Sequence, residues 1–325
     1  MGYDRSVDYK CYRTLVPIKK QMPDQGPFVF RDSDGGYLEG KLIDGKPAGR
    51  LRYVSAQGHV MEGSCRGGVW EGACTETFAD GTVMEGSRKE GKWNGPCRIR
   101  FADGLIMEGI KKDGLWDGDF TMTEPGGMVI AGVRKGENYI GSLKQRDREG
   151  NVFICPWKNE GWNGEGTLYF SGGAVLFAEF IDGRPVGGAC VCFPNGGIYS
   201  GDWDGGIYGE GIFSCTCKRP GFYSMVYSGN WIDNEPSDAA AELTIKDTSL
   251  GGDYRYLGGI KGWQLSGKGK IFYIENTRKD SLKVLVAKGI WQGGKRKSLR
   301  SDAKLCQIEK LFQEALACMR QGIVF

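Results

Sequence analysis

Histidine is almost missing from this sequence, and its scarcity limits the chemistry that the protein can perform. His59 is the only histidine among 325 residues. Ser-His-Asp triads, histidine general bases and histidine-rich metal sites all need more imidazoles than the chain supplies. His59 stands in an expected turn before Met61, where we expect an exposed side chain. The sequence therefore predicts no enzymatic activity, no catalytic residues, no metal and no other cofactor.

Long apolar runs are missing as well. No stretch approaches the ~18 residues of a membrane-spanning helix, and no secretory signal opens the chain. Gly2 fits the N-myristoylation pattern, but the bulky Tyr3 beside it makes a poor substrate. The 11 cysteines, an odd number, fit reduced thiols better than a disulfide framework. We expect a cytoplasmic protein, with peripheral attachment to a membrane or a cytoskeletal structure left open.

A strong charge of either sign is also lacking, since the net charge is +3. Proteins that wrap nucleic acid need a strongly basic face, so no nucleic-acid partner is expected. One local basic surface lies at the end of the repeat array and consists of Lys288, Lys295, Arg296, Lys297, Arg300 and Lys304. A weaker basic set consists of Arg134, Lys135, Lys144, Arg146 and Arg148. Such segments either attract anionic lipid or an acidic partner, or are ordinary solvated loops.

Glycine, in contrast, is abundant and periodic. Of the 54 glycines, one series recurs every 23 residues from Gly58 to Gly196, and a second series runs in phase from Gly49 to Gly187. A fixed period of this size indicates a repeat array, in which each unit buries its apolar face against its neighbours. We expect both series to occupy turns, because glycine readily adopts the positive φ that tight turns need.

Apolar and polar residues alternate between these glycines, which predicts antiparallel hairpins with one packed face and one solvated face. The packed face is expected to hold Leu51, Tyr53, Cys74, Phe78, Cys97, Ile99, Phe101, Phe120, Met122, Leu168, Phe170, Val191 and Phe193. An aromatic row at one repeat position, which either packs between hairpins or binds a ligand, consists of Trp70, Trp93, Trp116, Tyr139 and Trp162. A ladder of solvated carboxylates on the open face is expected from Glu39, Glu62, Glu85 and Glu108.

Two Cys-x-Cys pairs, Cys190 with Cys192 and Cys215 with Cys217, raise the question of a zinc site. The phase of the repeat places Cys215 on the packed face and the first pair on the open face. Thiolates on opposite sides of a sheet cannot share one ion. No metal site is therefore expected.

Several segments carry a family resemblance. Residues 157–173 read WKNEGWNGEGTLYFSGG, and residues 199–203 and 227–231 read YSGDW and YSGNW. They resemble the membrane occupation and recognition nexus (MORN) repeat, over roughly residues 37–294, about ten units. The first five units depart from this pattern at their opening tyrosine and have Leu38, Met61, Met84, Met107 and Ile130 there. The resemblance implies a scaffold, and repeats of this family also accompany methyltransferase and lipid-kinase domains.

Four segments are predicted along the chain: a non-repeat N-terminal cap at 1–37, seven regular 23-residue MORN repeats at 38–198, about three longer irregular repeats at 199–299, and a C-terminal amphipathic helix at 300–325. The helix itself is expected over 301–321, with Ser301 or Asp302 as its cap and Gly322 at its end. Its apolar seam is Leu305, Ile308, Phe312, Ala315 and Met319, with Leu316 beside it. This seam either covers an open sheet edge or pairs with a second copy.

The predicted fold is therefore all-β: an elongated single-layer antiparallel sheet of about ten consecutive β-hairpin MORN repeats, about 20 strands, with a C-terminal capping α-helix. The predicted function is a non-enzymatic scaffold that presents an extended surface for protein–protein, cytoskeletal or membrane-associated assembly. Three alternatives remain: a phosphoinositide-binding peripheral membrane protein, a targeting subunit of an enzyme complex, and a structural component of a protist or a large virus. Protein partners are expected, while weak anionic-lipid binding and a homodimer through the helix or the array end are left open.

Overall fold

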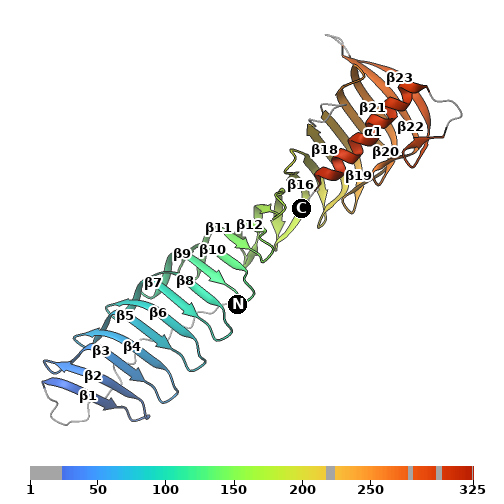
Figure 1. The fold of residues 1–325 in the computed structure, drawn as a ribbon. Coiled ribbons are helices and arrows are strands. Elements are labelled where there is room, and N and C mark those ends of the chain that lie inside the picture. The colour runs from blue at the N-terminus through green and yellow to red at the C-terminus, as the bar shows by residue number, and fades with distance from the viewer. Residues whose placement is uncertain (1–23, 217–223, 277–280, 298–301, 324) are drawn as a thin grey trace. The chain divides into compact units, whose positions relative to one another are not determined.

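The computed structural model describes residues 24–216, 224–276, 281–297, 302–323 and 325. They form one antiparallel sheet of 24 strands and one C-terminal helix (Figure 1), which confirms the expected fold class. The chain divides into two compact units, Met1–Arg148 and Glu149–Phe325. The division lies inside the segment assigned to regular repeats, and the four segment bounds stay predictions.

The N-terminal unit consists of hairpins joined in chain order, each strand pairing with the next. Its strands are β1 (Gln25–Arg31), β2 (Tyr37–Ile43), β3 (Lys46–Val54), β4 (Val60–Arg66), β5 (Val69–Thr77), β6 (Val83–Lys89), β7 (Lys92–Arg100), β8 (Ile106–Lys112), β9 (Leu115–Thr123), β10 (Val129–Lys135) and β11 (Asn138–Arg146). Strand β1 lies within the predicted cap and extends the sheet by one strand.

Two kinds of turn alternate along this unit. The two-residue turns have positive φ at both positions, as at Glu90 (52°) and Gly91 (83°), which is typical of type I′ hairpins. The three-residue loops end in a glycine of the first series, such as Gly104, whose φ is 88°. Each loop is closed by a backbone bond like that from Phe101 N–H to the Leu105 carbonyl, at 2.8 Å. The first glycine series thus lies in turns, as expected.

The expectation that the second glycine series also lies in turns was wrong. Gly95 lies inside β7 with a φ of 93°, at a break in register. Gly86 pairs with Cys97 while Arg88 pairs with Trp93, so β7 carries extra residues opposite β6. A bulge of this kind needs a residue in the left-handed region, and glycine supplies it at little cost.

Neighbouring hairpins of the N-terminal unit share one core and a repeated hydrogen bond. The turn glycine of one hairpin donates its N–H to the carbonyl of an aromatic-row residue in the hairpin before it, as from Gly91 to Trp70 (3.1 Å) and from Gly114 to Trp93 (2.9 Å). The core consists of Phe28, Leu38, Leu42, Leu51, Met61, Cys65, Trp70, Cys74, Met84, Trp93, Cys97, Met107 and Trp116. Each hairpin is therefore stabilised by its neighbours, as expected of a repeat array.

The C-terminal unit continues the same pattern with longer strands towards its end. Its strands are β12 (Val152–Lys158), β13 (Gly161–Trp162), β14 (Gly164–Tyr169), β15 (Val175–Ile181), β16 (Arg184–Cys192), β17 (Ile198–Trp203), β18 (Ile207–Thr216), β19 (Ser224–Ile232), β20 (Glu235–Thr248), β21 (Gly252–Lys261), β22 (Gln264–Asn276), β23 (Ser281–Gln292) and β24 (Lys295–Arg296). One face of this sheet is covered by helix α1 (Ala303–Gly322) (Figure 1).

The helix begins and ends close to the expected positions. The Asp302 side chain accepts a hydrogen bond from the Lys304 N–H, so Asp302 is the N-cap, whereas Ser301 lies outside the described residues. Gly322 is the last helical residue rather than the residue after it. A Cβ there would collide with Asn195, so the helix end lies tightly against the loop before β17.

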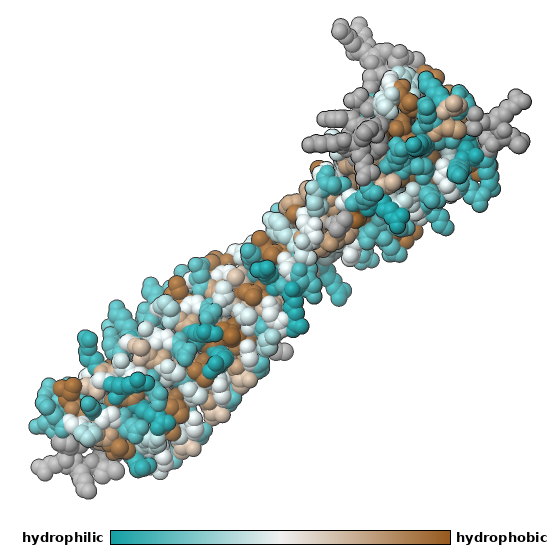
Figure 2. All heavy atoms as spheres, viewed as in Figure 1, coloured by the Kyte–Doolittle hydropathy of each residue, from teal (hydrophilic) through white to brown (hydrophobic). Residues whose placement is uncertain are grey.

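Helix α1 covers a face of the sheet, which corrects the expectation of a cap over an edge. All five seam residues are buried, in one core with Tyr256 and Trp291. The Phe312 ring lies 6.0 Å from that of Tyr256, and the Phe325 ring lies 5.5 Å from that of Phe193. Figure 2, drawn from the side of the helix, shows largely hydrophilic residues over this part. The seam is thus occupied within the chain in this structure, rather than exposed to a second copy.

Candidate interaction surface

A network of charged side chains lies buried in the N-terminal unit. The Glu76 carboxylate contacts the Arg88 guanidinium at 2.6 Å and the His59 Nε2 at 2.9 Å. The Glu76 and Arg88 side chains are only 5% and 4% exposed. The expectation that His59 is exposed in a turn was wrong, because its ring stacks on Phe78 at 5.2 Å and its exposed fraction is 16%.

The charges of this network hold one another in place. Burial by itself would raise the pKa of Glu76, but the hydrogen bond from His59 and the Arg88 charge outweigh it and hold that pKa below its usual value. The carboxylate is therefore ionised at neutral pH. Because the Glu76, Arg88 and His59 side chains are enclosed on the packed face of the sheet, we interpret the network as structural.

The aromatic row is covered by a second row of side chains. Arg88, Lys111 and Arg134 place their charges 4.4, 4.6 and 5.1 Å from the ring centres of Trp93, Trp116 and Tyr139. In the next repeat, Trp157 meets Trp162 edge-on at 5.3 Å. Three members of the row, Trp70, Trp93 and Trp116, are buried, while Tyr139 and Trp162 are half-buried. These rings contribute to packing and cation–π contacts, and Arg134 does not belong to a free basic surface.

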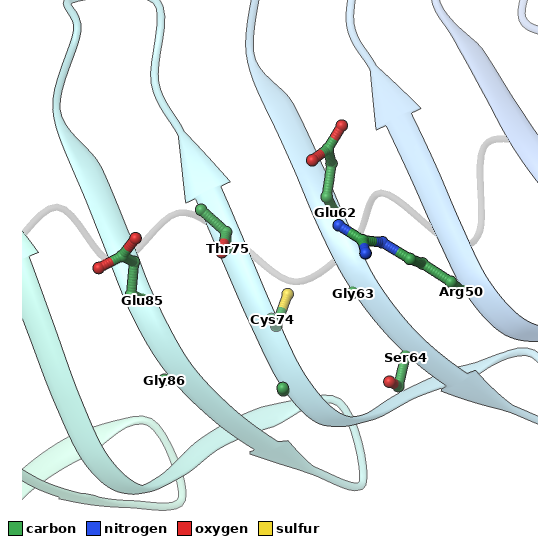
Figure 3. A pocket seen from close by; sticks show the side chains of 9 residues that line it. Arg50, Glu62, Gly63, Ser64, Cys74, Thr75, Glu85 and Gly86 are labelled. Atoms are coloured by element: carbon green, nitrogen blue, oxygen red, sulfur yellow. The ribbon is translucent and has the colours of Figure 1, made fainter.

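A polar depression of about 360 Å³ lies on the open face of β3 to β6 (Figure 3). Its lining includes Arg50, Glu62, Thr75 and Glu85, with Gly63 and Gly86 leaving room between them. Cys74 also contributes atoms, but burial raises the pKa of its thiol to about 11, so it is protonated at neutral pH. The depression offers carboxylates and hydroxyls on an open surface and no activated nucleophile.

The expected carboxylate ladder runs past this depression. Glu39 and Glu62 lie on either side of Arg52, at 3.5 and 2.7 Å, and Glu108 lies 3.4 Å from Arg98. The interleaved arginines neutralise much of the ladder. Surface pairs of this kind contribute little to stability.

The nine cysteines among the described residues are all free thiols. Cys215 is buried, while Cys190 and Cys192 lie on the other face and are half-buried, as the repeat phase predicts. Cys217 lies outside the described residues. In the part of the chain that the structure describes, no group of three or more metal-ligating side chains could hold an ion. No helix among these residues is long and apolar enough to cross a membrane.

The predicted basic surface is only partly available. Lys288, Lys295, Lys297 and Lys304 are exposed. The Arg296 guanidinium instead pairs with Glu309 of α1 at 3.1 Å, and both side chains are 14% exposed. Arg300 lies outside the described residues. Arg296 therefore fixes the helix to the sheet rather than facing a partner.

An apolar surface that the sequence reasoning missed lies on the C-terminal unit, on the sheet face opposite α1. We call it the outer strip, and it consists of Tyr169, Val175, Phe177, Cys190, Cys192, Ile198, Ile212 and Val226. The register places Val175, Cys192 and Ile198 side by side on successive strands.

The exposed fractions of Tyr169, Phe177 and Ile212 are 43%, 46% and 50%. Alternating residues such as Val191 and Phe213 are fully buried on the other face. The open face of the N-terminal unit also has exposed apolar residues, such as Ile110 and Val133, but they lie among charged side chains, whereas every strand from β14 to β19 contributes an apolar side chain to the outer strip.

Four carboxylates border the outer strip along one side. This acidic rim consists of Glu165, Glu179, Asp202 and Glu210, all exposed. Glu165 and Glu179 occupy directly opposed positions on β14 and β15. No ion pair within the described residues involves the rim; the pairs of this unit are Arg255–Glu242, Arg296–Glu309 and Lys310–Glu314. The rim therefore presents uncompensated negative charge.

A lysine face lies further along the same side of the sheet and consists of Lys268, Lys270, Lys283 and Lys288 of β22 and β23. Lys270 and Lys288 are directly opposed, and Lys268 is opposed to Ile290. Leu285 and Ile290, both about half exposed, lie among them. Only Lys288 of this set was identified from the sequence. Strand alternation in β22 and β23 was the signal that would have found the others.

The chain matches no model of a protein family and no curated protein. Among solved structures it is similar to the TCP10 domain of CPAP from Danio rerio, with 12% identity, a TM-score of 0.38 and coverage of 70% of this chain and 96% of that chain. It is also similar to the SAS-4 (dCPAP) TCP domain of Drosophila melanogaster, solved with a proline-rich motif of Ana2 (dSTIL), with 11% identity, a TM-score of 0.34 and coverage of 57% and 93%.

Proposed function

We propose that this chain is a MORN-type repeat array that acts as a non-enzymatic scaffold, with the outer strip as its docking surface for a protein partner. The observation that carries the proposal is the exposure of apolar side chains over six successive strands, β14 to β19, on a face that no described residue covers. Contiguous apolar patches on a protein surface are typical of interaction sites. If the partner is an enzyme, the scaffold would act as the targeting subunit of an enzyme complex, which is one form of the same role.

The strip is suited to docking because its residues face outwards from a rigid sheet. Their neighbours along each strand, such as Leu176, Val191 and Tyr199, are fully buried and hold the strands in place. A partner therefore meets a preformed surface and little ordering free energy is lost on binding. Substitutions on the strip should change binding without disturbing the core.

The test is affinity purification from the native source with two matched variants. Ile198→Asp with Ile212→Asp places two charges on the outer strip, while Ile110→Asp with Leu115→Asp places two charges on similarly exposed positions of the N-terminal unit. We expect the first variant to lose specific partners identified by mass spectrometry and the second to keep them. Identical partner sets for both variants would refute the outer strip as the docking surface.

A second candidate function, binding to an anionic membrane, is favoured by the lysine face. Opposed lysines are unfavourable in an isolated sheet, and they are interleaved here with exposed aliphatic side chains. Basic residues near an anionic bilayer gain about 1 kcal/mol each. Sedimentation with phosphatidylserine vesicles should deplete the wild type but not the variant Lys268→Glu, Lys270→Glu, Lys288→Glu. Equal sedimentation of both, or none with either, would exclude this function.

A further inference from the structure

We infer that the partner element docked on the outer strip is an amphipathic helix that carries a row of basic side chains beside its apolar face. This inference rests on the proposed function and specifies the chemistry of the partner. It follows from the acidic rim, from the spacing of the strands and from the position of α1 on the same sheet.

The acidic rim is not required by the repeat fold. Of the equivalent opposed pairs in the N-terminal unit, Ala73–Ser87 and Pro96–Ile110 are uncharged, and Arg50–Ser64 and Asp119–Val133 carry one charge each, so none of them opposes two like charges. Glu165 opposite Glu179 places like charges where they destabilise a strand pair. A cationic partner would relieve this repulsion, whereas an acidic partner would add to it.

Glu179 and Glu210 lie two residues from the nearest strip residue of their own strand, whereas Glu165 and Asp202 lie four residues from Tyr169 and Ile198. Two residues along a strand correspond to about 7 Å. The partner must therefore present basic groups roughly this far or further to one side of its apolar contacts, as adjacent faces of a helix do.

A helix fits across these strands. The strand spacing of about 4.8 Å is close to the helical pitch of about 5.4 Å, so successive turns can contact successive strands. Six strands extend over about 24 Å, which corresponds to a helix of about 16 residues. The opposite face already accepts such a helix, since α1 contacts both β20 and β22. These features favour a helix over an extended peptide, which would need a free strand edge to form ladder hydrogen bonds.

The test is selection from a displayed library of helical peptides with randomised apolar and flanking positions. The bait is the full chain. Peptides that also bind the variant Ile198→Asp with Ile212→Asp bind outside the outer strip, and they are discarded by counter-selection. We expect enriched peptides to carry Lys or Arg on one flank. Their affinity for the variant Glu165→Gln with Glu179→Gln should fall about tenfold, with a weaker dependence on salt. The matched control is Glu85→Gln with Glu108→Gln on the N-terminal unit, which should leave affinity unchanged.

Two results would overturn the inference. Enriched peptides with neutral or acidic flanks, or with equal affinity for the rim variant, would reject the basic partner. Failure to enrich any helical peptide over the strip variant would reject the helix. Either result leaves the proposed function intact if the strip variant still loses partners in affinity purification, so the two failures are distinguishable.

Discussion

Replacing Glu76 by glutamine should destabilise the strands around it by about 3 kcal/mol. Glutamine keeps the size of the side chain and can accept hydrogen bonds, but it removes the charge that lies 2.6 Å from the Arg88 guanidinium. Removing one partner of a buried ion pair costs about 3 to 5 kcal/mol, because the other charge is left uncompensated. The retained hydrogen bonds place the expected cost at the lower end of that range.

The repeat supplies a matched control for this substitution. Other repeats have Leu105, Ile99 and Cys65 at the positions of His59, Glu76 and Arg88, at distances of two, one and one periods along the chain. The triple variant His59→Leu, Glu76→Ile, Arg88→Cys removes all three groups together. Its free energy of unfolding should lie within about 1 kcal/mol of that of the wild type or exceed it, since apolar replacement of a buried ionic cluster is often neutral or stabilising.

Native-state hydrogen exchange of the β5 to β7 amides measures both changes locally, without requiring the whole array to unfold in one step. A cost below about 1 kcal/mol for Glu76→Gln, or a larger loss for the triple variant than for the single one, would refute the argument that the charges are buried and mutually compensated.

Four further outcomes are expected. The stability that Glu76 contributes is present above its unfolded-state pKa of about 4.3 and is lost as the pH falls through its lower folded-state pKa. Acid should therefore lower the protection factors of the β5 amides, which are corrected for the intrinsic exchange rate, in the wild type more than in Glu76→Gln; identical pH profiles of protection would contradict this. Trp93→Ala should cost about 3 to 5 kcal/mol in denaturant unfolding, whereas a cost below about 1 would mean that the ring is not packed. Gly95→Ala should cost at least about 1 kcal/mol in the same assay, because its φ of 93° disfavours a residue with a Cβ. An unchanged free energy of unfolding would mean that the bulge does not require glycine. Deleting residues 302–325 uncovers an aromatic core, so light scattering should show aggregation; a dimeric parent that becomes a well-behaved monomer would instead identify α1 as an oligomerisation helix.

The fold could be predicted from the sequence because its period and its alternation are both local. Residues such as Leu51 and Val191 mark the packed face through strand periodicity alone, and the structure buries both. The bulges could not be located in the same way. Glycine indicates that a positive φ is available, but it does not distinguish a turn such as Gly104 from a bulge such as Gly95.

The candidate surface was harder to predict because it depends on departures from the repeat. His59 looked exposed when considered alone, although Leu105 and Ala174 occupy the same repeat position and show that it faces the core. The outer strip was missed because open-face positions were taken as mostly polar, while Phe177 and Ile198 are exposed apolar residues on that face. The burial of Arg296 depends on Glu309 of the helix, a long-range contact that no local pattern contains.

The hydrogen bond from each turn glycine to the hairpin before it limits how such a chain can change length in evolution. Removing one whole period of 23 residues, for instance 92–114, would bring equivalent donors, acceptors and rings together again at the junction. A deletion of another length within a strand would misalign the contacts at the junction, and an odd slip there would also turn packed side chains towards solvent. The gene is therefore expected to grow or shrink by whole hairpins, each of which changes the length of a unit by about 9.6 Å. A molecule built in this way can be adjusted to the distance between its partners in discrete steps while each interface stays unchanged.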